Sequence, residues 1–577
     1  MGIYCERTPS RAEGIAVIAV AFLLIHALGV SPLRELFRDE MLFAAAASSP
    51  AAFPNAVIHG VPSPQVMPLF PAAARLLHLL TGLSIVAALR LLSLAMLGAT
   101  AVVVYFAAVG GRSRTAGFAA AAMYLSTILS VEKGFNGTPI TTGAFFLLCA
   151  QMSFFHFGLR HYEWDRAWII SGLLILAGFL TEGFPVIFFF AAPLCFFRRP
   201  LSVRSKFRKP GFVVAVVLVA ATLLWWLHGL VPQGIINPEF IDWSRFSFSR
   251  YLLELICFLP ELTLRMLPWS LIAWIPFCVA LQALDSTPLL GRYLLTLFWV
   301  TLGALWLLPF IPPEYIFYLL GPLAILVGRT YELALRRYGR ILRRVLAAAP
   351  LTALAMILCI ALAGFAPDTL LAKIVSLHHS LGFRSQPSFL VIAPAAALLL
   401  AALTVYLRFG IRSEPMWMML LGTAVAIGIF HSAVMLPYQA QERDKRDFGG
   451  AVRSALAGVP ADERRIFTLK VRDLYGGLFY SGVPVISLRS TAELPQSESP
   501  TVYLLSPDFP NAPERGWSNL LPLNFSYRKH KINLWRGVWR QRETGSADPL
   551  LENLKDDPGP LSRNGNSDTT DSTKPQY

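Results

Sequence analysis

Charged residues are scarce in this 577-residue sequence, where Asp, Glu, Lys and Arg make up 15% of the chain and hydrophobic residues make up 55%. Soluble domains typically carry about 25% charged residues. The shortfall is concentrated between Gly14 and about Pro437, where uncharged runs of membrane-helix length recur. The composition therefore excludes a soluble multidomain protein and indicates a polytopic membrane protein.

Cysteine is also scarce, with six residues in the whole chain. They are widely spaced and lie in or near apolar segments, at Cys5, Cys149, Cys195, Cys257, Cys278 and Cys359. Such spacing encodes neither a disulfide framework nor a thiolate metal site.

Basic residues outnumber acidic ones by 50 to 35, and the formal net charge is +15. A basic excess can indicate nucleic-acid binding, but no polar segment of this sequence forms a basic and aromatic nucleic-acid-binding module. In a membrane protein the excess has a simpler cause, which is the retention of Lys and Arg on the cytoplasmic side. We therefore expect membrane lipids, and no nucleic acid, as partners.

Hydropathy predicts about thirteen membrane-spanning helices, because a helix that crosses a bilayer needs about 20 mostly apolar residues. A cleaved signal peptide at 13–30 is the alternative for the first of them. The apolar stretch Val66–Leu80 is short and contains Pro68 and Pro71, so it is predicted to lie in the membrane interface. The approximate ranges of the spans are 14–30, 84–110, 116–131, 139–159, 167–181, 183–197, 211–231, 267–284, 293–310, 315–328, 345–366, 387–407 and 416–437.

Alternate loops of this arrangement collect the positive charge, which gives an orientation. The segments 198–209 and 329–344 each contain six Lys or Arg residues and fall on the same side as the N-terminus. This side is therefore predicted to be cytoplasmic. Residues 1–437 then form the transmembrane domain, with the first loop, 31–83, and everything after residue 438 outside.

After Pro437 the composition changes abruptly, and pieces typical of helices and strands alternate from 438 to 540. Helices are expected at 451–459 and 474–480, and strands at 466–471, 483–488, 501–506 and within 525–535. These features predict a small external α/β domain, too poor in His, Asp and Glu clusters to be catalytic by itself. Residues 541–577, rich in Ser, Asp, Pro and Asn, are predicted to be a disordered tail.

The first external loop holds Arg38-Asp39-Glu40 just ahead of an alanine-rich apolar stretch. A carboxylate at the membrane surface can accept a proton as a general base or coordinate a divalent cation. The alternative is helix capping, because Asp39 and Glu40 precede a helix-forming run and favour its positive end. Glu182, between two apolar spans, is a further candidate because an unpaired carboxylate there is costly, unless its loop opens to water.

Several motifs occur in a fixed order along most of the chain. They are Arg38-Asp39-Glu40, Pro64-Gln-Val-Met-Pro68-Leu-Phe, Ala88-Leu-Arg90-Leu-Leu-Ser-Leu, Leu180-Thr-Glu-Gly183-Phe-Pro185, Leu267-Pro268-Trp269-Ser270 and the segment Tyr315–Gly328. Their order and spacing resemble the GT-C glycosyltransferases, above all the bacterial lipid A aminoarabinose transferases and the protein O-mannosyltransferases. The predicted thirteen spans followed by an external α/β domain also resemble the aminoarabinose transferases.

The resemblance implies an inverting enzyme of the bacterial inner membrane. Such an enzyme transfers a sugar from a polyprenyl phosphate to a hydroxyl group of a lipid, glycan or protein on the external face. The resemblance makes Asp39 the base or a metal-linked acid, with Glu40 beside it. A divalent metal ion is the one candidate cofactor, and His59 in the same loop is its candidate ligand, although a lone loop histidine is more often only solvated.

The donor phosphate requires cations at the external surface, because a polyprenyl phosphate leaves readily once its charge is neutralised. The candidates are Arg38, Lys133 and Arg265, each of which is equally well explained as a solvated charge. Motifs shared with the family add Gln65, Glu182 and Tyr315 as substrate-binding candidates.

Three departures from the family pattern are compatible with a different donor or acceptor, or with a protein that has lost transfer activity. Relatives often carry a lysine where this chain reads Gln65–Pro68, an aspartate where it reads Asn136-Gly137, and Ser-x-x-Lys where it reads Pro312–Tyr315. One alternative is therefore a catalytically silent relative that acts as an interaction protein. A transporter or flippase is another, but the sequence lacks the inverted repeats and paired mid-membrane charges that such proteins use.

Overall fold

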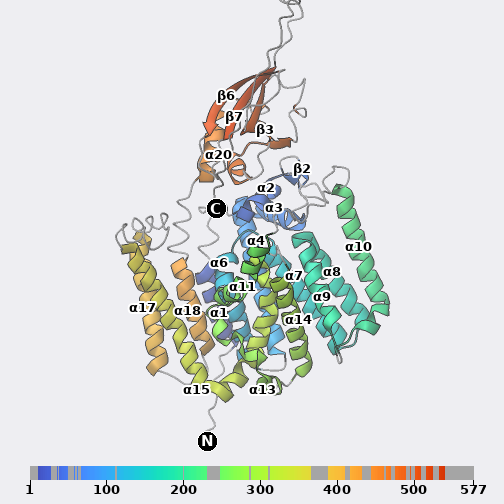
Figure 1. Cartoon of the computed structure of the whole chain (residues 1–577), viewed down its shortest axis with the longest axis vertical. Coiled ribbons are helices and arrows are strands. Elements are labelled where there is room, and N and C mark those ends of the chain that lie inside the picture. The colour runs from blue at the N-terminus through green and yellow to red at the C-terminus, as the bar shows by residue number, and fades with distance from the viewer. Residues whose placement is uncertain are drawn as a thin grey trace, which may run out of the picture.

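The structure is a computed structural model in which a helical body carries a five-stranded sheet at one end (Figure 1). We call the end of the helical body nearest the sheet the sheet-side end, and the other the opposite end. The residues described are 11–26, 35–36, 38–49, 57–58, 61–62, 66–110, 113–198, 201–230, 247–284, 287–308, 312–365, 387–409, 416–431, 444–460, 463–469, 475–488, 494, 501–507, 515–523 and 532–539.

Apolar helices build the helical body, as hydropathy predicts. Within the described residues, six helices are long and apolar enough to cross a membrane, and the number of spans rises to seven if one bent pair of helices counts as a single span. The predicted total of thirteen spans is therefore not confirmed. Together with the helices described below, the helical body contains α1 (Arg11–His26), α4 (Ile85–Val109), α5 (Arg114–Ser126), α6 (Ile128–Lys133), α7 (Ile140–Ser153), α8 (Trp164–Glu182), α9 (Phe184–Phe196), α10 (Pro210–Leu230), α14 (Pro288–Leu307), α15 (Ile316–Phe365), α17 (Pro387–Phe409) and α18 (Met416–Phe430).

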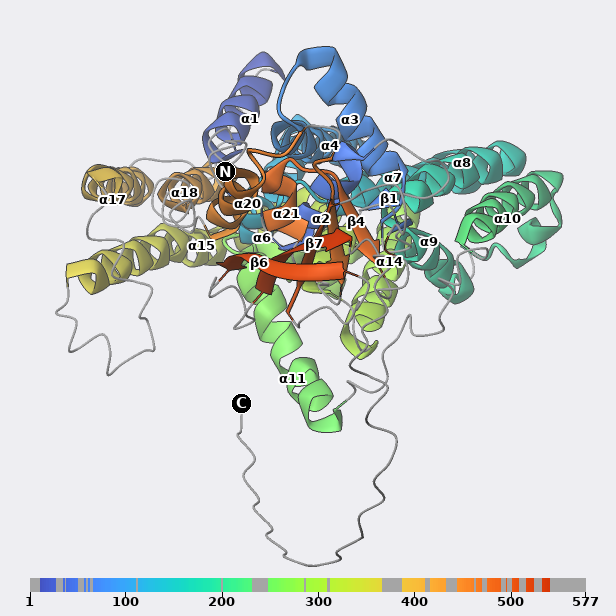
Figure 2. The same ribbon diagram turned by 90° about the horizontal axis from the view of Figure 1, so that it is seen from above.

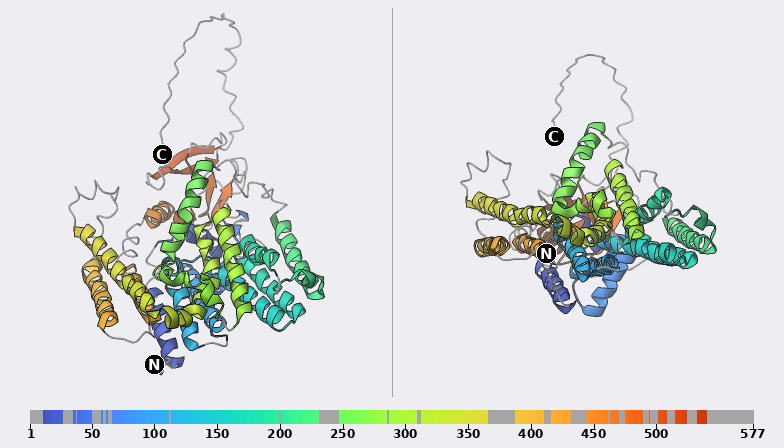
Figure 3. Two further views of the ribbon diagram at one scale, coloured as in Figure 1. Left: turned by 60° about the horizontal axis from the view of Figure 1, so that its bottom comes forward. Right: turned by 90° about the horizontal axis from the view of Figure 1, so that it is seen from below.

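The predicted span 267–284 is not a single helix. It is divided into α12 (Ser270–Ala273), the 3-10 turn η6 (Ile275–Phe277) and α13 (Val279–Gln282). Proline at 268 and 276 explains the division, because a proline has no N–H to donate within a helix. The preceding helix α11 (Phe248–Arg265) leans outward from the body and meets the α12–η6 segment at 109° (Figure 2, Figure 3).

Helices α5 and α15 approach closely because small residues face each other. Every α5 residue from Ala116 to Ser126 is buried. A Cβ added at Gly328 of α15 would lie 2.4 Å from the Ala116 carbonyl oxygen, so a larger residue there would force the helices apart. The contact fixes α15, and with it the 3-10 turn η7 (Pro313–Tyr315) that precedes it, against the body.

Helix α3 (Leu69–Thr81) covers most of the segment predicted to lie in the interface. It buries Phe70 and Ala74, whereas Leu79 and Leu80 on its other side are 68% and 74% exposed. Its 13 residues are too few to cross a bilayer, as predicted. Helix α2 (Arg38–Ser48) packs beside α3, and the short strands β1 (Val57–Ile58) and β2 (Val61–Pro62) form a hairpin-like pair between them in the chain.

The sheet beyond the helical body has the strand order β4-β3-β5-β7-β6, with β3 parallel to β4 and β5 and with β7 antiparallel to β5 and β6. Its core contains Val452, Leu478, Leu505 and Leu534. The elements are α20 (Asp444–Ala455), β3 (Ile466–Leu469), α21 (Tyr475–Ser481), β4 (Val485–Leu488), β5 (Thr501–Ser506), β6 (Arg515–Leu523) and β7 (Ile532–Trp539). Strand β6 is missing from the sequence prediction. The domain boundaries and the disordered tail stay predictions, and 541–577 lies outside the described residues.

Candidate functional site

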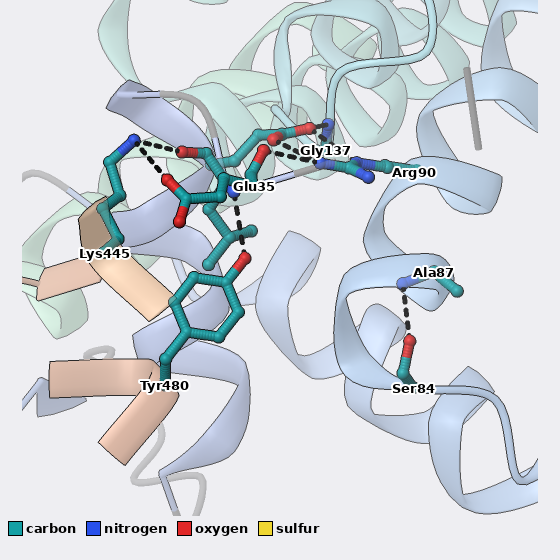
Figure 4. A network of polar contacts seen from close by, with 9 residues as sticks. Glu35, Ser84, Ala87, Arg90, Gly137, Lys445 and Tyr480 are labelled. Carbon is teal, nitrogen blue, oxygen red and sulfur yellow. Dashed lines mark hydrogen bonds and ion pairs between the residues drawn. The ribbon is translucent and has the colours of Figure 1, made fainter. Parts of the chain in front are cut away.

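A fully buried ion pair anchors α2 to the helical body. The Glu40 carboxylate accepts hydrogen bonds from Arg90 of α4, at 3.1 Å from Nε and 3.0 Å from Nη2. The backbone N–H of Gly137 donates to the same carboxylate at 2.7 Å (Figure 4). Glu40 is 1% exposed and Arg90 is not exposed at all. Because a buried charge is strongly destabilising without its partner, the Glu40–Arg90 pair fixes the first turn of α2.

The turn that supplies Gly137 is itself held by α4. The Ser93 hydroxyl donates to the Thr138 carbonyl at 2.9 Å, and the Thr141 hydroxyl donates to the Ser93 carbonyl at 3.1 Å. These contacts hold the junction of α6 and α7 beside the α4 turns that carry Arg90. The amide that binds Glu40 is therefore preorganised.

A second anchor attaches the residues before α2 to the sheet domain (Figure 4). The Arg446 backbone N–H donates to the Glu35 carboxylate at 3.0 Å, and Lys445 Nζ lies 3.6 Å from it. Lys445 also donates to the Leu36 carbonyl at 3.0 Å, and the Leu36 N–H donates to the Tyr480 hydroxyl at 3.1 Å. Burial raises the pKa of the Glu35 carboxyl above its ordinary value, against the opposing effects of the Arg446 amide and Lys445.

Three predicted site residues from distant parts of the sequence meet at the sheet-side end. Lys133 at the end of α6 lies 3.0 Å from the Glu314 carboxylate of η7. The neighbouring Tyr315 hydroxyl hydrogen-bonds to Glu182 at the end of α8. Lys133, Tyr315 and Glu182 are thus linked through Glu314 into one cluster, which we call the Lys133–Glu182 cluster.

A glycine makes room for the Lys133–Glu182 cluster. A Cβ added at Gly143 of α7 would lie 2.9 Å from the Tyr318 hydroxyl and 3.0 Å from the Glu182 Cβ. Glycine therefore lets the Tyr318 hydroxyl of α15 and the Glu182 side chain of α8 approach the α7 backbone.

Arg265 ends α11 close to the start of α6. The Ile128 N–H of α6 donates to the Leu267 carbonyl at 2.9 Å, and Arg265 pairs with Glu261 of its own helix at 2.7 Å. Arg265 Nη1 is buried and finds no acceptor in the described part of the chain. Lys133 lies at the other end of α6, about 8 Å further along its axis. The guanidinium therefore retains a donor for an anionic group near a second cation.

The remaining predicted residues are only partly placed. Arg38 and Asp39 begin α2, but their side chains are outside the described part of the structure, as are Gln65 and His59 entirely. Within the described residues, no group of three or more His, Cys, Asp and Glu side chains is arranged to hold a metal ion.

Comparison with known proteins identifies the fold. A family model described as dolichyl-phosphate-mannose-protein mannosyltransferase matches residues 62–226. The apo crystal structure of ArnT from Cupriavidus metallidurans superposes with a TM-score of 0.64 and 16% identity, covering 90% of this chain and 97% of that one. The chain has the GT-C fold. The resemblance predicted from the sequence is thereby confirmed.

A second GT-C structure supports the same match. ArnT from Cupriavidus metallidurans bound to undecaprenyl phosphate superposes with a TM-score of 0.62 and 15% identity, covering 92% of this chain and 98% of that one. No curated protein matches the sequence. At this level of identity the likeness establishes the fold, and the activity must be argued from the site.

Sequence reasoning missed most members of the two anchors. The sequence motif that begins at Ala88 contains Arg90, but no role was predicted for this residue, although a lone arginine within an apolar helix indicates a buried partner. Glu35, Lys445, Arg446 and Tyr480 carry no comparable signal, because their contacts join segments about 400 residues apart.

Proposed function

We propose that this protein is a membrane glycosyltransferase that moves a sugar from a polyprenyl phosphate to a hydroxyl group of a lipid, glycan or protein. The observation that carries the proposal is the convergence of α2, Lys133, Arg265 and the Glu182–Tyr315 pair on one end of a GT-C fold. These groups supply cations for a phosphate and carboxylates for a sugar hydroxyl within one region.

The proposed reaction is a single displacement that inverts the anomeric carbon. The acceptor oxygen forms a bond to that carbon while the bond from carbon to the phosphate oxygen breaks. Polyprenyl phosphate leaves with the electron pair, and the acceptor proton passes to Asp39. A positioned base contributes about 10²–10⁴-fold to such a step.

Within this mechanism Glu40 is a positioning residue. Its carboxylate already accepts three hydrogen bonds and is shielded from water, so a further proton would have to displace Arg90 or the Gly137 amide. Asp39 precedes it in the same helical turn. The buried pair therefore holds the Asp39 backbone while leaving the base role to Asp39.

Arg265 and Lys133 are the proposed phosphate ligands. Their basic character and their places at the two ends of α6 suit an anion that bridges them. Arg265→Gln should weaken binding of undecaprenyl phosphate about tenfold, because a charge-assisted hydrogen bond is lost. Arg166→Gln, an exposed arginine at the opposite end, is the matched control and should leave binding unchanged. Equal affinity of the wild type and Arg265→Gln for undecaprenyl phosphate would show that Arg265 does not bind the phosphate.

The distribution of charge supports transfer on the external face. The basic segment around Lys206 lies at the opposite end, where the Lys206 carbonyl accepts a hydrogen bond from Trp168 near the start of α8. Helix α8 ends with Glu182 at the sheet-side end. Because Lys and Arg are retained in the cytoplasm, the sheet-side end is the proposed external end.

Mass spectrometry of lipids and glycoproteins from deletion and parent cells tests the function. The proposal expects one sugar-modified species to disappear on deletion and to return when the full chain is restored. Identical profiles from deletion and parent cells would contradict the proposal and favour a catalytically silent relative that acts as an interaction protein. Retention of every sugar modification, with a lipid or solute redistributed across the membrane, would instead indicate the transporter.

A further inference from the structure

A second concave site lies at the opposite end of the helical body, between α4, α14 and the π-helix η2 (Phe154–Arg160) that continues α7. Its cavity measures about 660 Å³. Binding sites for small molecules typically measure about 300–1,000 Å³. The cavity is therefore large enough for an organic ligand, and the proposed glycosyl-transfer chemistry does not use it.

The walls of this groove change character along its length. Val103 and Phe106 of α4 and Phe155 of η2 form an apolar part. Arg160 and Thr287 lie where η2 ends and α14 begins. Because these residues lie at helix ends, the polar part of the groove faces the membrane surface and the apolar part faces the lipid interior. Such an arrangement suits an amphiphile.

The polar part favours an anion. Arg160 is exposed, and the described residues that line the groove include no Asp or Glu. The first hydrogen bond within α14 runs from the Gly291 N–H to the Thr287 carbonyl, so the amides of Leu289 and Leu290 stand at the positive end of the helix. Both residues line the groove. Two independent sources of positive potential therefore meet there.

Buried contacts hold the mouth of the groove in place. Arg329 of α15 is 1% exposed and donates to the Thr287 hydroxyl at the start of α14. The π-helical form of η2 is also typical of functional positions in helices.

We propose that this groove binds an anionic glycerophospholipid of the adjacent leaflet. Its phosphate lies against Arg160 and the start of α14, and one acyl chain lies along Val103 and Phe106. The apolar walls favour a lipid over free phosphate, and the basic mouth favours an anionic headgroup over a zwitterionic one. The site is separate from the sheet-side cluster, so the proposal does not depend on transferase activity.

Native mass spectrometry of the full chain in detergent tests the site with phosphatidylglycerol and phosphatidylcholine as probes. The wild type should retain phosphatidylglycerol at least several-fold more tightly. Arg160→Gln should lower that affinity about tenfold and leave phosphatidylcholine unchanged. Arg208→Gln, which removes an exposed arginine of the 3-10 turn η3 (Arg204–Arg208) at the same end, is the matched control and should change neither.

A second variant tests the apolar part. Ala107→Phe fills the groove from α4 and should lower retention of both lipids. Inorganic phosphate should not compete with phosphatidylglycerol. The proposal is overturned if both lipids bind equally, if Arg160→Gln behaves like Arg208→Gln, or if polyprenyl phosphate displaces phosphatidylglycerol at equal concentration.

Discussion

Glu35 and Glu40 hold the start of α2 in two different ways. Glu40 points into the helical body, where Arg90 and the Gly137 amide bind it out of contact with water. Glu35 points toward the sheet domain, where its partners are the Lys445 ammonium group and the Arg446 backbone amide. The inner anchor joins two fully buried charges that depend on each other, whereas the outer anchor joins the buried Glu35 carboxylate to a Lys445 side chain that is 16% exposed.

The difference assigns separate tasks to the two anchors. Breaking a buried ion pair leaves an uncompensated charge and is strongly destabilising. The outer anchor depends on a backbone hydrogen bond to the Glu35 carboxylate and on a longer contact to Lys445, and a hydrogen bond to a charged group is worth about 1.5–3 kcal/mol. We infer that the inner anchor maintains the fold around Asp39, and that the outer anchor sets how firmly the sheet domain is attached to the same segment.

The largest expected effect comes from the inner anchor. Arg90→Ala should lower the free energy of unfolding by about 3–5 kcal/mol, because Glu40 would remain buried without its partner charge. Thermal unfolding in detergent measures the loss. The exposed control Arg166→Ala should cost less than about 1 kcal/mol. If the double variant Glu40→Met/Arg90→Met is less stable than Arg90→Ala, the buried pair is not the cause.

A smaller effect is expected at the outer anchor. Tyr480→Phe removes the acceptor of the Leu36 N–H, at a cost of about 1 kcal/mol. Hydrogen–deuterium exchange should show faster exchange around Leu36, with α4 unaffected. Tyr162→Phe, at a tyrosine that is 73% exposed, serves as the control. Equal acceleration in α4 would show that the two anchors do not act separately.

The smallest expected effect is the pH dependence of the outer anchor. Burial raises the pKa of Glu35 in the folded protein above its ordinary value of 4.5, so the folded state binds more protons than the unfolded state just above that pH. Attachment of the sheet domain should therefore weaken as pH rises from 4.5 through the raised pKa. Glu35→Gln should abolish this trend in hydrogen exchange of α20. Attachment that strengthens over the same range in the wild type would contradict the assignment.

The helical body could largely be predicted, because long uncharged runs have few alternatives in a bilayer. The segment 267–284 could not, since its prolines divide a run whose composition is that of a span. Strand β6 was missed because Ser518, Asn519 and Pro522 weaken the strand pattern, and its pairing with β7 outweighs them.

The sequence nominates candidate site residues one by one, but it does not predict their arrangement. Glu182 and Lys133 stand out as charges next to apolar runs, yet the sequence does not show that Glu314 and Tyr315 connect them. Glu40 was predicted as a catalytic residue, and its buried hydrogen bonds favour a positioning role instead. The prediction for Asp39 remains to be tested.

Substitution of Asp39 tests the central claim most directly. Deletion cells would be complemented with wild type, Asp39→Asn or the exposed control Glu163→Gln, and the sugar-modified species would be quantified by mass spectrometry at matched protein levels. The account predicts that Asp39→Asn lowers the product at least about 100-fold, the lower end of what a general base contributes, while Glu163→Gln restores it. Unchanged product with Asp39→Asn would contradict the account.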